Sequence, residues 1–183
     1  MRELSLHVLD VVENSLAAGA THITLEIDEN LQEDRLTIAV TDNGHGMDAE
    51  TVNRALDPFY TTRTTRHVGL GLPLFKAAAE RCNGRLVLES APGDGTRVQV
   101  SFQRSHIDRA PLGNMVSTLL GILLAERVAE VRYVHRVGDQ QFGFDTEEIR
   151  RTLGGVSMSH PLVQEWLQGF LTEGEAGVSD GQG

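Results

Sequence analysis

The order of helical and alternating segments in the first hundred residues constrains the fold more than any other feature of this chain. Apolar residues at spacings of three and four indicate helices, and strict alternation of apolar and polar residues indicates strands. The predicted order is helix, strand, strand, helix, loop, helix, strand, strand, over residues 3–18, 21–28, 36–40, 48–56, 57–68, 69–82, 86–90 and 97–102. Because strands and helices do not alternate singly, this order predicts an α/β two-layer sandwich with a mixed, largely antiparallel sheet and helices on one face.

The chain changes character after the last of these strands. An irregular stretch, an apolar helix, a hairpin around Gly138-Asp139, a short helix starting at Asp145 and a last helix over 160–172 are predicted in turn. The end of the chain is rich in glycine and acidic residues, which is typical of disorder. We therefore expect a domain over 1–104, a small α/β C-terminal extension over 105–172 and a disordered tail over 173–183.

Composition excludes several classes of function. Of the 183 residues, 26 are acidic and 16 are Lys or Arg, a net charge of −10 that disfavours binding to nucleic acid or to a membrane surface. The single cysteine excludes a disulfide framework and a cysteine-based zinc site. No apolar run approaches the roughly 20 residues that cross a bilayer. We expect a cytoplasmic protein that does not enter the membrane.

Two polar residues share a face of the first predicted helix. Asp10 and Asn14 are four residues apart, with His7 one turn earlier. A carboxylate beside a carboxamide can hold a hydrated Mg²⁺, which prefers oxygen ligands and takes few of them from protein. The alternative is the solvated polar face of an ordinary amphipathic helix.

A glycine-bearing loop, residues 42–47, follows the second predicted strand directly. Its glycines would let the backbone approach a flat ligand closely, and Asp42 at the strand end can accept a hydrogen bond from an amine such as that of adenine. A plain Asn-Gly turn is the alternative for this segment taken alone.

The segment Gly69-Leu70-Gly71-Leu72 opens a helix, so free N–H groups and the positive end of the helix dipole favour an anion there. The loop before it contributes Thr61, Thr62 and Arg63, which suit phosphate oxygens. An ordinary loop before a helix is the alternative.

Five segments in order resemble the N, G1, F, G2 and G3 boxes of the GHKL ATPases, the superfamily of DNA gyrase, the large heat-shock chaperones, sensor histidine kinases and mismatch-repair MutL proteins. They are residues 12–21 (VENSLAAGAT), 42–46 (DNGHG), 57–62 (DPFYTT), 69–72 (GLGL) and 93–96 (GDGT). The resemblance covers about residues 4–103 and implies the Bergerat ATP-binding fold. The N box is most similar to MutL, whereas the F and G2 boxes and the short lid between them are most similar to sensor histidine kinases.

This resemblance implies ATP and Mg²⁺ as cofactors and a role for each matching residue. Asn14 would bind the metal, Asp42 would recognise adenine, and Asp10 occupies the position where many members carry a glutamate general base. Arg63 would act beside the phosphates. The implied nucleotide-binding residues are Asn14, Asp42, Gly44, Gly46, Phe59, Thr61, Thr62, Arg63, Gly69, Leu70, Gly71, Leu72 and Thr96.

A sixth segment resembles the phosphoacceptor box of histidine kinases. In Ser-His-Ile-Asp-Arg-Ala-Pro-Leu, residues 105–112, the histidine, arginine, proline and leucine stand at matching offsets. This predicts His106 as a phosphoacceptor, although the acid, Asp108, stands one position later than in the pattern. The alternative is that His106 ends a strand and Pro111 starts a helix.

Three functions are compatible with these patterns. The first is a Mg·ATP-dependent protein kinase of the histidine-kinase-like class, phosphorylating a partner protein or itself. The second is a nucleotide-gated regulatory binding module, and the third is an ATP-hydrolysing clamp of the mismatch-repair type. A protein partner is expected in each case. The apolar face around Trp166 suits internal packing and, alternatively, a homodimer or partner contact.

Overall fold

The computed structural model describes residues 3–57, 71–125 and 129–179. The chain order of its elements is α1 Leu4–Ala17, β1 His22–Asn30, β2 Arg35–Asp42, α2 Ala49–Ala55, α3 Gly71–Arg81, β3 Arg85–Ser90, β4 Thr96–Gln103, α4 Met115–Leu124, β5 Glu130–Val137, β6 Gln140–Asp145, α5 Thr146–Leu153 and α6 Pro161–Ser179. Every predicted helix and strand that falls within the described residues is present.

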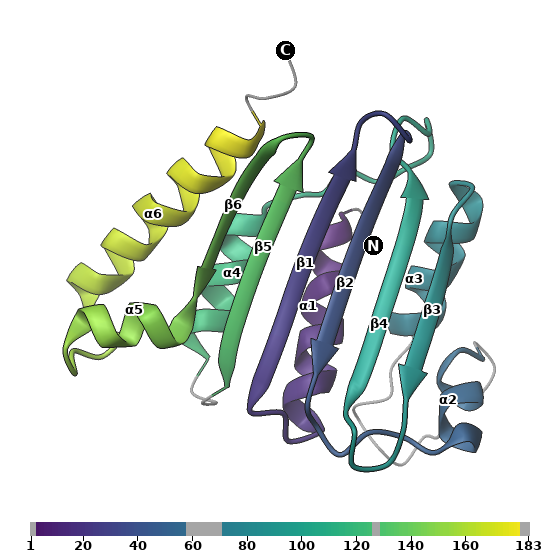
Figure 1. Cartoon of the computed structure of the whole chain (residues 1–183), viewed down its shortest axis with the longest axis horizontal. Coiled ribbons are helices and arrows are strands. Elements are labelled where there is room, and N and C mark those ends of the chain that lie inside the picture. Colours follow the sequence, from purple (N-terminus) through teal and green to yellow (C-terminus); the bar gives the residue numbers. More distant parts are fainter. Residues whose placement is uncertain (1–2, 58–70, 126–128, 180–183) are drawn as a thin grey trace.

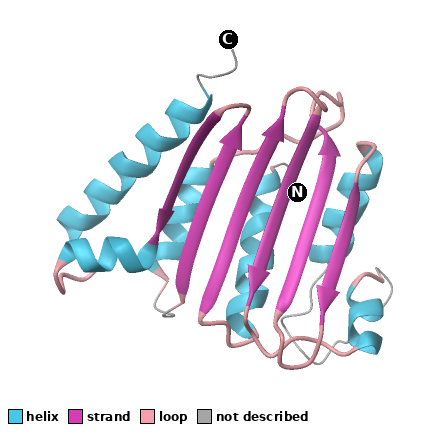
Figure 2. Ribbon diagram, viewed as in Figure 1, coloured by secondary structure: helices cyan, strands magenta, loops and turns pink. Residues whose placement is uncertain are grey.

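The strands form one six-stranded sheet in the order β3-β4-β2-β1-β5-β6. All neighbouring strands run antiparallel except β1 and β5, which are parallel. Helices α1, α3 and α4 lie behind the sheet in Figure 1, and among the described residues no helix crosses the face turned towards the viewer in Figure 2. The predicted sandwich with a mixed sheet and helices on one face is confirmed.

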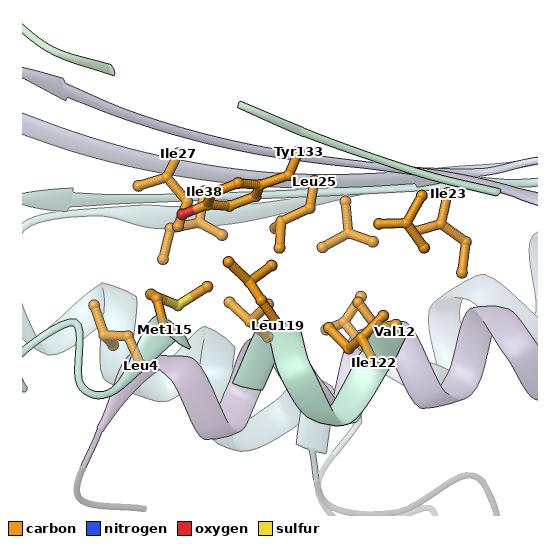
Figure 3. Packing of buried hydrophobic residues seen from close by; sticks show 14 of the residues in the cluster. Leu4, Val12, Ile23, Leu25, Ile27, Ile38, Met115, Leu119, Ile122 and Tyr133 are labelled. Carbon is orange, nitrogen blue, oxygen red and sulfur yellow. The ribbon is translucent and has the colours of Figure 1, made fainter. Parts of the chain in front are cut away.

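Alternation along the strands builds the core between the two layers. Ile23, Leu25 and Ile27 of β1 are at most 1% exposed, while the residues between them face the open side of the sheet. Figure 3 shows these side chains pointing down onto Val12 of α1 and Leu119 of α4. Because α1 and α4 bury side chains in the same cluster, the C-terminal segment completes the core of the N-terminal part.

The C-terminal strands extend the sheet at the edge of β1. The β5–β6 hairpin turns at Gly138, as predicted, and β5 pairs with β1 from His22↔Glu130 to Glu29↔Val137. Helix α5 begins after Asp145, whose side chain accepts a hydrogen bond from the Glu147 N–H and so caps the helix.

The prediction of a disordered tail from residue 173 is wrong for residues 173–179, because α6 continues to Ser179. Two contacts explain the longer helix. Val178 is 2% exposed, and Glu175 accepts a hydrogen bond from the Tyr133 hydroxyl at 2.8 Å and lies 3.0 Å from Nδ1 of His135. A composition typical of disorder is overridden here by burial and hydrogen bonding to β5. Residues 180–183 lie outside the described part of the chain.

Candidate functional site

The carboxylate of Asp42 is buried and held from both sides at the end of β2. Asp42 is 8% exposed. Oδ1 accepts a hydrogen bond from the Gly44 N–H at 2.8 Å, and Oδ2 accepts one from the Ser15 hydroxyl at 2.5 Å. The predicted adenine-recognition residue is therefore fixed in one orientation by its own loop and by α1.

The loop after Asp42 is packed against the turn between β3 and β4. Gly46 has a φ of +68°, and a Cβ at this position would collide with the carbonyl oxygen of Ala91. The Gly93 N–H donates to the His45 carbonyl at 2.8 Å. Only glycine at position 46 lets these two segments, the G1 and G3 boxes of the sequence analysis, lie in contact.

Thr96 stands beside Asp42 in the same framework. The two residues are partners in the β2–β4 ladder. The Thr96 hydroxyl lies 3.0 Å from Oγ of Ser90, and Ser90 in turn accepts from the Met47 N–H at 2.8 Å and donates to the Gly95 carbonyl at 2.7 Å. The structure thus brings Thr96 to Asp42, Gly44 and Gly46, from which it is distant in the sequence.

The second half of the site lies where α1 meets the start of α3. A Cβ on Gly71 would lie 3.1 Å from Oδ2 of Asp10, so the first residue of α3 approaches that carboxylate closely. The first N–H groups of a helix have no partner within the helix and carry the positive end of its dipole. Leu72 is half-buried against the core and anchors this end of α3.

Asp10 and Asn14 both have oxygen atoms available for a ligand. Both side chains are half-buried, and neither makes a hydrogen bond to another side chain or backbone group in residues 3–57, 71–125 or 129–179. Burial, with a smaller contribution from the nearby Glu13 carboxylate, raises the pKa of Asp10 above its ordinary value. A bound cation would reverse this penalty, so the unpaired oxygens fit the Mg²⁺ that the GHKL resemblance implies, with Asn14 as the protein ligand.

A buried histidine, His7, packs between α1 and α3 next to the contact of Asp10 with Gly71. The rings of His7 and Phe75 stack with centroids 4.6 Å apart and an interplanar angle of 4°. Burial is the main reason that the pKa of His7 is lowered to about 4, so the ring is neutral at pH 7. The stack joins α1 to α3 one turn below Asp10 and Gly71, which makes His7 a packing residue of the site.

Six of the predicted site residues, Phe59, Thr61, Thr62, Arg63, Gly69 and Leu70, lie outside the described residues. Their roles remain predictions, as does the interpretation of 57–68 as a loop over the nucleotide.

The structure does not bring His106 to the site. Asp42 pairs with Thr96 at one end of the sheet, whereas Arg35 pairs with Gln103 at the other, and His106 follows Gln103. Eight strand residues span about 23 Å. His106 also lies in an irregular segment that precedes α4, and its Nδ1 accepts the Asp108 N–H at 3.2 Å, which leaves the proton of the neutral ring on Nε2. This geometry offers no support for transfer to His106 within one molecule.

Ser15 is the site residue that the sequence reasoning missed. It is 3% exposed and occupies a position in the apolar stripe of α1 that also contains Val8, Val11 and Val12. A polar residue inside an apolar stripe was the available signal, because buried hydroxyl groups need hydrogen-bond partners.

Comparison with known proteins shows which family the chain belongs to. Residues 2–106 match the family described as histidine kinase-, DNA gyrase B-, and HSP90-like ATPase. The chain belongs to this family. Sensor histidine kinases are among the proteins to which this ATPase domain is similar.

Three relatives illustrate the match. The chain is 35% identical over 105 residues to the sensor histidine kinase YxdK of Bacillus subtilis, covering 54% of this chain and 32% of that protein. It is 44% identical over 89 residues to the sensor protein kinase FleS of Pseudomonas aeruginosa, covering 49% and 22%. It is 30% identical over 106 residues to the sensor protein kinase WalK of Staphylococcus haemolyticus, covering 54% and 17%.

The chain spans less than a third of the length of each of these relatives. The family match ends at residue 106, before α4. Within the described residues, no helix combines the length and the hydrophobicity needed to cross a bilayer.

Proposed function

We propose that this protein binds Mg·ATP and transfers the γ-phosphoryl group to a partner protein, as a kinase of the histidine-kinase-like class. One observation carries the proposal: helix α1 brings together the Asp42 carboxylate, which Ser15 of α1 fixes, and the unpaired oxygens of Asp10 and Asn14, and Asp10 lies against the start of α3. Adenine, metal and phosphates have suitable groups at these three places. Phosphoryl transfer asks the protein mainly for positioning and charge neutralisation, which such groups supply.

Each group has a separate task in this proposal. Asp42 accepts a hydrogen bond from the adenine amine, Asn14 holds the metal ion, and the free N–H groups at the start of α3 bind phosphate oxygens. The metal ion supplies positive charge against the phosphate oxygens when it is bound. Asp10 would orient a water molecule beside the metal site, and its carboxylate is the candidate base when water is the acceptor.

A partner is preferred to self-phosphorylation because His106 lies at the opposite end of the sheet from Asp42. The nucleotide-gated binding module is the second candidate. The pairing of β5 with β1 favours it, because the C-terminal segment then shares a sheet with the nucleotide site. A partner bound to that segment would be linked to the site through the sheet. The relatives are sensor kinases, which argues against the mismatch-repair type of clamp.

Two measurements test the proposal. We expect calorimetry to show Mg·ATP binding by the full chain, and Asp42→Ala to weaken it by roughly 1–3 kcal/mol through the lost hydrogen bond. Incubation with γ-labelled ATP and a two-helix phosphoacceptor domain of a sensor histidine kinase should then yield acid-labile label on that domain. Unchanged ATP affinity in Asp42→Ala would refute the adenine assignment.

The label also separates the alternatives. Release of free phosphate that Asp10→Ala abolishes would indicate an ATPase, and tight binding with neither product would indicate the gated module. Equal acid-labile label on the unsubstituted chain and on His106→Ala, without added acceptor, would exclude His106 as the acceptor.

A further inference from the structure

We propose that Ser15 is a positioning residue that determines nucleobase specificity: its hydroxyl orients Asp42 so that the site selects a 6-aminopurine over a 6-oxopurine triphosphate. This inference rests on the proposed function, because it assumes that the site binds ATP. It assigns a role to a buried residue of α1 for which packing alone would favour an apolar side chain.

The direction of the Ser15 hydroxyl follows from two distances. Oγ lies 3.3 Å from the Val11 carbonyl and 2.5 Å from Oδ2 of Asp42. A serine inside a helix usually donates to the carbonyl four residues back. The contact with the carboxylate is in the range of a charge-assisted O–H···O⁻ bond, which is the stronger of the two. The proton therefore points to Asp42.

Two donors then fix the Asp42 carboxylate, one on each oxygen: the Ser15 hydroxyl on Oδ2 and the Gly44 N–H on Oδ1. An ionised carboxylate has about four acceptor positions, so each oxygen keeps a free lone pair for a ligand. Because Asp42 is 8% exposed, little water is available to replace a lost donor. The acceptor direction is set before the ligand arrives, which lowers the cost of ordering on binding.

This arrangement distinguishes purines by the group at position 6. An amine donates an N–H to the fixed carboxylate, whereas a 6-oxo group places an acceptor against it and removes that hydrogen bond. Sites built to hydrogen-bond a particular group discriminate strongly against analogues that lack it. Removing the Ser15 hydroxyl should therefore weaken ATP more than inosine triphosphate (ITP).

The test compares the affinities of ATP and ITP for the full chain with Mg²⁺ present. We expect the unsubstituted protein to prefer ATP, and Ser15→Ala to reduce that preference about tenfold through weaker ATP binding, with ITP affinity unchanged. Ser15→Cys retains a weak donor and should fall between the two. Ser5→Ala is the matched control, since Ser5 lies on the same helix and is 1% exposed. Its hydroxyl donates to the Glu3 carboxylate over 3.3 Å and makes no hydrogen bond to Asp42.

A double substitution tests whether Ser15 acts through Asp42. In an Asp42→Asn background, Ser15→Ala should change the ATP-to-ITP ratio no further. A further change of the same size as in the single variant would overturn the inference.

Three other results would also overturn it. They are an unchanged ATP-to-ITP affinity ratio in Ser15→Ala, an equal loss of affinity for both nucleotides in that variant, and a ratio in Ser15→Cys equal to that of the unsubstituted protein. If Ser15→Ala does not fold, the cysteine variant decides. Failure of the unsubstituted chain to bind either nucleotide would overturn the proposed function as well, whereas normal ATP binding with an unchanged ratio would remove only the role of Ser15.

Discussion

The family-matched part of the chain and the C-terminal segment share one sheet, but the half-buried polar side chains of α1 and those around β5 differ in whether they have partners. In the first, Asp10 and Asn14 have no side-chain hydrogen bonds to the described residues. In the second, His135 lies between Glu29 and Glu175, and Arg150 forms an ion pair with Glu130. The unpaired oxygens on α1 are available to a ligand, whereas the paired groups of the C-terminal segment stabilise the fold.

The two buried histidines show the same contrast. Burial lowers the pKa of His7, stacked on Phe75, to about 4. Burial alone would also lower the pKa of His135, but the hydrogen bond to Glu175 and the negative charges of Glu175 and Glu29 raise it to about 9. Equal burial therefore gives a neutral ring in one region and a charged ring in the other, because only the second has carboxylate partners.

The largest expected effect tests whether the two regions share one core. Leu119 of α4 is fully buried, so Leu119→Ala should lower the free energy of unfolding by about 2–5 kcal/mol. Leu162→Ala, at a residue that is 70% exposed, is the matched control and should change it by less than about 0.5 kcal/mol. Urea unfolding followed by circular dichroism gives both values.

The fluorescence of Trp166, the only tryptophan, reports separately on α6. We expect its transition to coincide with that of the circular dichroism signal. Two separate transitions, with ATP binding retained after the first, would show that the C-terminal segment is an independent domain. The two regions would then not share one cooperative core.

The second prediction compares a glycine from each region. Gly46 and Gly154 both have positive φ, +68° and +59°, but a Cβ would collide with Ala91 only at position 46. Gly46→Ala should therefore lower ATP affinity more than tenfold, by displacing the loop after Asp42. Gly154→Ala should leave ATP affinity unchanged and cost only the roughly 1–2 kcal/mol of a left-handed alanine.

Calorimetry with Mg·ATP measures the affinities, and thermal unfolding measures the stability of both variants. Equal ATP affinities in the two variants would mean that contact between the Gly46 and Ala91 segments does not position Asp42.

The third and smallest effect is on the pH dependence of stability. The pKa of folded His135 is raised above its unfolded value, so its stabilisation is complete below about pH 6.5 and is lost as the pH rises to about 9. The pKa of folded His7 is lowered, so its stabilisation is present above about pH 6.5 and is lost as the pH falls to about 4. The free energy of unfolding should therefore be highest near about pH 6.5 and fall towards both lower and higher pH.

Urea midpoints between pH 4 and pH 9 check this. His135→Gln should flatten the decline between about pH 6.5 and 9 and leave the acid side unchanged, and His7→Phe should do the reverse. An alkaline decline that persists in His135→Gln would assign it to other groups.

Most elements and half of the candidate site could be predicted from the sequence, because the signals are local. Alternation predicted β1 and β2, and the polar loop after β2 predicted Asp42 as a ligand residue. The error at residues 173–179 came from composition: glycine and acidic residues gave no indication that Glu175 hydrogen-bonds to Tyr133 and His135. Those partners lie about forty residues away in the chain.

By itself, the sequence determined the helix and strand periods, the glycine-bearing loops and the residue types at their ends, since these depend on neighbours within a few positions. Only the tertiary structure decided that Ser15 faces Asp42, that Gly71 lies against Asp10, and that His106 is at the far end of the sheet. The physical reason is that each of these relations depends on strand pairing and helix packing between segments distant in the chain, and local patterns do not specify distances across the core.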